Sequence, residues 1–61
     1  MEKYVLYDST DDSVVCRDDW KVLLFDSHEQ AEEEWTGHPE KVTHFKDLPL
    51  HIQKLILNEN N

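Results

Sequence analysis

The chain has 61 residues, among them fourteen Asp or Glu and six Lys or Arg, so its formal net charge at pH 7 is −8. A chain this short folds as one domain and has little room for both a hydrophobic core and a substrate pocket. We therefore expect no enzyme and no catalytic residues. The acidic balance also argues against direct binding of nucleic acid, because phosphate contacts need a surface rich in Lys and Arg.

The composition indicates a folded domain rather than an acidic disordered tail, because 38% of the residues are hydrophobic and Trp, Tyr and Phe each occur twice. The longest apolar run covers only residues 22–25, far short of the ~20 residues that a membrane helix needs. Cys16 is the single cysteine and cannot form an intrachain disulfide. With no secretory pattern after Met1, the sequence predicts a cytoplasmic protein that does not bind membranes.

The first part of the chain predicts a three-stranded antiparallel meander. Residues 3–7 and 13–17 carry β-branched and aromatic side chains, and the residues between them are rich in Asp and Ser, as in turns. Asp18 and Asp19 predict a second short turn before a third strand at residues 20–25. Because this third segment is apolar on both faces, we expect it to be the central strand.

A helix is predicted over residues 28–36 by its start and stop signals. Ser27 is followed three residues later by Gln30, which is the capping-box pattern at the beginning of a helix. Gly37, the only glycine, suits the left-handed position after the last helical residue. The prolyl segment 38–40 prevents the helix from continuing.

The last part of the chain predicts a short fourth strand over residues 41–45 and a final helix. Asp47 is expected to cap this helix, which should end near Leu57 and leave residues 58–61 frayed. The order β-β-β-α-β-α predicts a small α+β domain, in which two helices cover one face of a mostly antiparallel sheet of three or four strands. The main alternative is a three-stranded sheet in which residues 41–45 form a loop.

The apolar residues of the predicted helical segments fall into two groups, one that faces the core and one that points away from it. The residues predicted to face the core are Ala31, Trp35, Leu48, Ile52, Leu55 and Ile56. Leu50 and Leu57 lie seven residues apart and point away from the first group. Two interpretations stay open: a partner or homodimer surface flanked by His51 and Lys54, or two leucines at helix ends that have no special role.

The acidic residues fall into three groups. They are Asp8, Asp11 and Asp12; Asp18 and Asp19; and Glu29, Glu32, Glu33 and Glu34. Glu33 and Glu34 lie near the end of the predicted helix, where negative charge is unfavourable, and Glu29 repels Glu33 one turn away. A dense anionic surface can occupy a basic groove that otherwise holds nucleic acid, as in the mimics that phages and mobile elements use. The alternative is a solvated face that keeps a small domain soluble.

Metal and cofactor sites are not expected. Asp8, Thr10, Asp12 and Asp19 fit a calcium-loop register in part, but Ser13 stands where that loop requires glycine. Cys16, His38, His44 and His51 are the candidate zinc ligands, and their spacing does not support a zinc site. Cys16 lies beside valines in a predicted strand, so we expect a buried, inert thiol.

The sequence therefore predicts a small acidic interaction module that binds, and inhibits or regulates, a protein with a basic surface such as a nucleic-acid-processing enzyme. The expected contacts are Asp11, Asp12, Asp18, Asp19, Trp20, Glu29, Glu32, Glu33 and Glu34. Trp20 lies next to a turn, so it is either a half-exposed interface anchor or a core residue at a strand start. The alternative function is a homo-oligomeric structural or regulatory domain that associates through Leu50 and Leu57.

Overall fold

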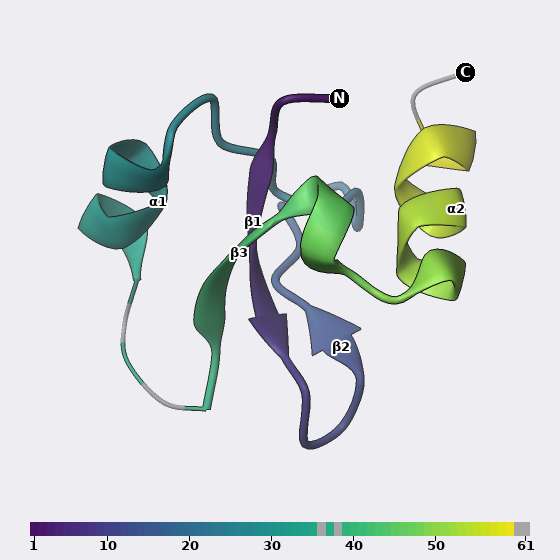
Figure 1. Ribbon diagram of the computed structural model, residues 1–61, viewed down its shortest axis with the longest axis horizontal. Helices are drawn as coiled ribbons and strands as arrows, with labels where there is room; N and C mark the ends of the chain where they lie inside the picture. Colours follow the sequence, from purple (N-terminus) through teal and green to yellow (C-terminus); the bar gives the residue numbers. More distant parts are fainter. Residues whose placement is uncertain (36, 38, 60–61) are drawn as a thin grey trace.

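The computed structural model describes residues 1–35, 37 and 39–59. Within these residues the elements are β1 (Tyr4–Asp8), β2 (Ser13–Val14), α1 (His28–Glu34), β3 (Lys41–His44), a 3-10 turn η1 (Phe45–Asp47) and α2 (Leu50–Glu59). β1 lies between the other two strands and pairs antiparallel with both, so the described sheet has the order β2-β1-β3 (Figure 1). The small α+β fold with an antiparallel sheet and two helices is confirmed.

The segment predicted as the central strand, residues 20–25, takes a different position. It joins the sheet only through isolated bridges, which pair Val22 with Cys16 and Phe25 with Tyr4. Tyr4 and Phe25 exchange two backbone hydrogen bonds of 2.9 Å, so the segment extends the sheet beside the beginning of β1. β1 is central instead, because Val5 and Leu6 are both buried and its two faces are therefore both covered.

The two helices cover opposite faces of the sheet, which corrects the expectation that both lie on one face. Val5 belongs to a cluster with Ile52 and Ile56 of α2, whereas its neighbour Leu6 belongs to a cluster with Ala31 of α1. Successive residues of a strand point to opposite faces, so the two clusters lie on either side of β1. Figure 1 shows α1 and α2 on opposite sides of the strands.

The first helix begins as its sequence predicts. The Ser27 hydroxyl accepts a hydrogen bond of 3.1 Å from the Gln30 amide, and the Gln30 side chain accepts one of 3.1 Å from the Asp26 amide. Ala31 is fully buried, as expected. Gly37 has a φ of +106°, in the left-handed region that favours glycine.

The end of α1 differs from the prediction. The helix stops at Glu34, and Trp35 has extended backbone angles as the C-cap. The Trp35 side chain is therefore 41% exposed rather than part of the core, and its indole N–H donates a hydrogen bond of 2.7 Å to the Glu40 carbonyl. The predicted helix end at Thr36, and His38 in the segment after it, lie outside the described residues.

The predicted strand over residues 41–45 is confirmed as β3, apart from its last residue, which begins η1. Asp47 lies in η1 and does not cap α2; the helix begins instead from the Pro49 carbonyl, which accepts hydrogen bonds from the Ile52 and Gln53 amides. Proline suits this place because it donates no backbone hydrogen bond.

The second helix buries Ile52 and Ile56 as predicted, but Leu55 is 44% exposed and lies outside the core clusters. α2 also continues two residues beyond the predicted end at Leu57, as far as Glu59. The fraying predicted for Asn60 and Asn61 lies outside the described residues. Among the described helices, neither has the length and apolar character that a membrane crossing requires.

Candidate interaction surface

The turn that follows Arg17 is a three-residue hairpin loop made of Asp18, Asp19 and Trp20. The Trp20 amide donates to the Arg17 carbonyl at 3.0 Å, and the Arg17 amide donates to the Lys21 carbonyl at 2.7 Å. This loop type places its third residue in the left-handed region, where glycine is favoured. Here the third residue is Trp20, with a φ of +69°. A bulky side chain occupies a position at which side chains are disfavoured.

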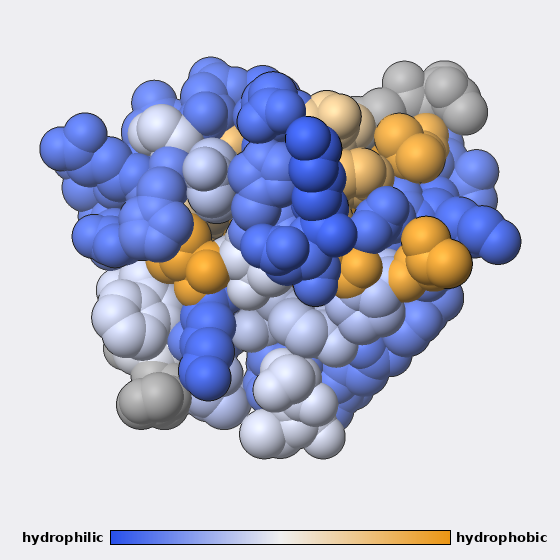
Figure 2. Space-filling view, viewed as in Figure 1, coloured by the Kyte–Doolittle hydropathy of each residue, from blue (hydrophilic) through white to orange (hydrophobic). Residues whose placement is uncertain are grey.

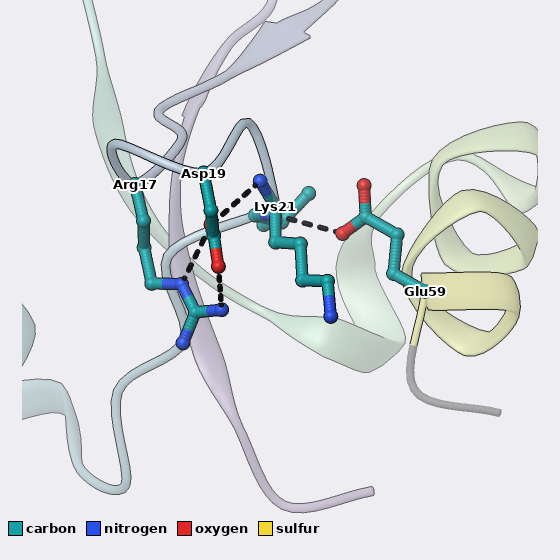
Figure 3. A network of polar contacts seen from close by, with 5 residues as sticks. Arg17, Asp19, Lys21 and Glu59 are labelled. Atoms are coloured by element: carbon teal, nitrogen blue, oxygen red, sulfur yellow. Dashed lines mark hydrogen bonds and ion pairs between the residues drawn. The ribbon is translucent and has the colours of Figure 1, made fainter.

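Side-chain contacts fix this turn in place (Figure 3). The Arg17 guanidinium donates to both carboxylate oxygens of Asp19, at 3.2 and 2.7 Å, and the Lys21 amide donates to Asp19 at 3.1 Å. The bond from the Lys21 amide and then that from Arg17 hold the pKa of Asp19 below its ordinary value. Just after the turn, the Val22 amide donates a hydrogen bond of 2.9 Å to the Glu59 side chain of α2.

The result is a pre-organised turn from which the Trp20 side chain projects into solvent with 85% of its surface exposed. The interpretation of Trp20 as a core residue is therefore wrong. Asp18 is also exposed, so the indole has a carboxylate two residues before it. We call Asp18, Asp19 and Trp20 the Trp20 turn. Trp is the side chain most enriched at the energetic centres of protein interfaces, and rigid presentation lowers the entropy cost of binding.

The acidic groups predicted to act together lie on different sides of the molecule. α1 covers the Leu6 face of the sheet, whereas Asp12 bonds to His51 of α2, which covers the Val5 face. Glu32 pairs with His28 at 2.9 Å. Across residues 1–35, 37 and 39–59, no ion pair involves the exposed side chains of Glu29, Glu33 and Glu34. The structure thus separates the acidic face of α1 from the Asp11 and Asp12 turn.

The acidic residues between β1 and β2 hold that turn together. Asp8 is buried and accepts hydrogen bonds from the Thr10 amide and hydroxyl at 2.9 and 2.6 Å, which lower the pKa of Asp8. Asp12 accepts a hydrogen bond of 2.5 Å from the Tyr7 hydroxyl and a second from His51, and both lower the pKa of Asp12. Asp11 accepts a hydrogen bond from the Ser13 hydroxyl. These carboxylates already have partners within the domain.

Both Leu50 and Leu57 are exposed, which leaves the interface interpretation a prediction, because exposed leucines at helix ends are also compatible with no special role. Leu50 is 71% and Leu57 46% exposed, and orange apolar side chains interrupt the blue surface over α2 in Figure 2.

Cys16 is exposed, which contradicts the expectation of a buried thiol. β2 ends at Val14, and only one bridge holds Cys16. In the described part of the chain, His, Cys, Asp and Glu side chains form no cluster of three or more suited to a metal ion.

Arg17 and Glu59 support the Trp20 turn and the segment after it, and neither was predicted from the sequence as a site residue. The spacing of Arg17 and Asp19 across a turn was a local signal that could have indicated their ion pair. The contact of Glu59 with Val22 joins residues 37 apart in sequence, so no local pattern could have indicated it.

The fold and this turn define a small acidic α+β domain that presents the exposed indole of Trp20. No known family model matches the sequence, and neither a curated protein nor a solved structure matches the chain.

Proposed function

We propose that this protein is a small acidic interaction module, without catalytic activity of its own, that binds a basic-surfaced protein and anchors itself there with Trp20. The observation that carries the proposal is the left-handed backbone of Trp20 together with its 85% exposure. Strained backbone positions cluster at functional sites, and neither local backbone preference nor core packing accounts for an indole here. A hydrophobic pocket on a partner does account for it.

The net charge of −8 supports a partner of opposite sign. Complementary charge speeds association with a basic surface and disfavours acidic partners. Asp18 lies beside the anchor, and the unpaired glutamates of α1 add to the long-range field. The mechanism is occlusion of a basic site on the partner, for which a nucleic-acid-processing enzyme is a suitable class. The division of the acidic groups between opposite faces favours an anchored contact over a continuous mimic of a nucleic-acid strand.

The test is a capture experiment with matched baits. The full chain and its Trp20→Gly variant are tagged and exposed to lysate of the source organism at low and high salt, and bound proteins are identified by mass spectrometry. We expect the wild type to retain a basic-surfaced partner at low salt and to release it at high salt. Trp20→Gly should bind the purified partner about thirtyfold more weakly or worse, as for an interface hot spot.

Two results would contradict the proposal: capture of no partner by the wild type, or equal affinity of the wild type and Trp20→Gly for the partner found. A second variant, Glu29→Lys with Glu33→Lys, reverses the charge of α1 and leaves the Trp20 turn intact. A loss of affinity in that variant assigns the α1 face to the contact. Unchanged affinity removes the α1 face and restricts the contact to the Trp20 turn.

A further inference from the structure

The outward side of α2 carries Leu50, Lys54 and Leu57. An α-helix turns by about 100° per residue, so these three side chains share the side opposite the buried Ile52 and Ile56. Leu55 lies about 140° around the helix from Leu50 and belongs to a different side. The outward side thus presents two exposed leucines seven residues apart, with one lysine between them. We call these three residues the α2 face.

Charge distinguishes the α2 face from the rest of the molecule. Of the fourteen acidic residues, Glu59 alone falls within α2, and its carboxylate turns inward to the Val22 amide. The nearest partner of His51 at the start of the helix is Asp12, which also accepts from Tyr7. Within the described residues, the α2 face is therefore apolar and weakly cationic on a body whose net charge is −8.

We infer that the α2 face binds the α2 face of a second copy of the chain. Against the acidic remainder of a second copy, these leucines would press on carboxylates and strip them of water, whereas a second α2 face offers leucines without a carboxylate between them. Pairing like with like across a two-fold axis leaves the acidic helix α1 on the far side of the sheet in each copy (Figure 1). In an antiparallel pair of helices, Leu50 of one copy meets Leu57 of the other, while the flexible Lys54 side chains extend to solvent.

The predicted dimer is weak and responds to salt in a characteristic way. Two leucines per helix bury less apolar area than a standard stable interface, so association is expected only at high protein concentration. The two bodies repel each other because each carries −8, and added salt screens that repulsion. Dimerisation should therefore strengthen with salt, whereas binding to a basic partner should weaken with salt.

The test is sedimentation equilibrium of the full chain at concentrations up to about 1 mM, in about 0.05 and 0.5 M salt. We expect a reversible dimer whose association constant rises about tenfold or more between the two salt concentrations. Leu50→Asp and Leu57→Asp should be monomeric throughout. Leu55→Asp is the matched control, because it adds the same charge at a leucine of nearly equal exposure on another side of the same helix.

A wild type that stays monomeric at about 1 mM and high salt would overturn the inference, as would a Leu55→Asp variant as monomeric as Leu57→Asp. Far-ultraviolet circular dichroism shows whether each variant is folded, so that loss of the dimer is not confused with loss of the fold. Trp20→Gly should dimerise like the wild type. The failure of one proposal is therefore distinguishable from the failure of the other.

Discussion

At position 20 the chain places an indole where the hairpin geometry favours a residue without a side chain. A left-handed backbone costs a residue other than glycine or asparagine roughly 1–2 kcal/mol. Because the Trp20 side chain is almost fully exposed, it recovers little of that cost from packing within the domain. Residues kept in such conformations at the expense of stability are typical of functional sites.

We expect Trp20→Gly to raise the free energy of unfolding by about 1 kcal/mol, because glycine adopts this φ without steric strain. Urea denaturation followed by circular dichroism measures the change. Trp20→Ala is the control: it also removes the indole but retains the Cβ and hence the strain, so its stability should stay near that of the wild type. A Trp20→Gly variant less stable than the wild type would show that the indole contributes to the fold.

Several residue positions could be read from the sequence because the relevant physics is local. The spacing on α2 separated Leu50 and Leu57 from the core residues, and the turn next to Trp20 allowed for its exposure, although it left burial in the core open. Trp35 and Leu55 were misplaced because helical periodicity gives a direction but does not tell how far the sheet extends beneath it. α1 stops before Trp35, and Leu55 lies at the edge of the buried side of α2.

At the scale of elements, α1 is seven residues long and depends on its cap. A helix of this length is unstable in isolation, so its first turn requires the hydrogen bond that the Ser27 hydroxyl accepts from the Gln30 amide. We expect Ser27→Ala to lower the free energy of unfolding by about 1 kcal/mol. Ser27→Asp is the matched variant, because it keeps an acceptor and adds a favourable charge at the helix N-terminus.

The comparison is made by urea denaturation of the wild type and the two variants. Ser27→Asp should be at least as stable as the wild type. If Ser27→Ala is as stable as the wild type, the cap contributes nothing and packing of Ala31 holds the helix in place.

The elements were predictable to different degrees. Both helices and β3 follow from caps, prolines and alternating side chains, which act within a few residues of sequence. The position of segment 20–25 was predicted wrongly because two apolar faces are compatible with either a central strand or a segment that pairs only with the end of another strand. Long-range pairing with Tyr4 decides between them. The separation of the acidic groups depends on which face of β1 each helix covers, and no local pattern encodes that choice.

At the scale of the whole molecule, hydrogen bonds to carboxylates link stability to pH. The pKa of Glu2 lies below its ordinary value because His44 and then Lys46 stabilise its charge. The Lys46 amide donates to Nδ1 of His44, so Nε2 carries the proton that is donated to Glu2. The pKa values of Asp8, Asp12 and Asp19 are also lowered. Each of these groups binds its proton more readily in the unfolded chain than in the folded one.

Below about pH 4, where unfolded carboxyl groups titrate, the unfolded chain therefore takes up more protons than the folded domain. We expect the free energy of unfolding to fall steadily as the pH is lowered from about 4.5 to 2. Urea denaturation at a series of pH values measures this dependence. Asp19→Asn should be less stable than the wild type at pH 7, and its stability should depend less steeply on pH below 4. An unchanged slope in Asp19→Asn would exclude the Asp19 contacts as a source of the pH dependence.

The central position of β1 in the sheet has a consequence for the synthesis of the protein on the ribosome. β1 is made before its partner strand β3 and its covering residue Ile56, which emerge some 40 to 50 residues later. Until then, the edge of Tyr4–Asp8 that β3 covers is open to other nascent chains. Asp11 and Asp12, which follow three and four residues after this segment, stand where gatekeeper charges are expected to oppose aggregation. We therefore expect the acidic charge to protect β1 before a folded surface exists.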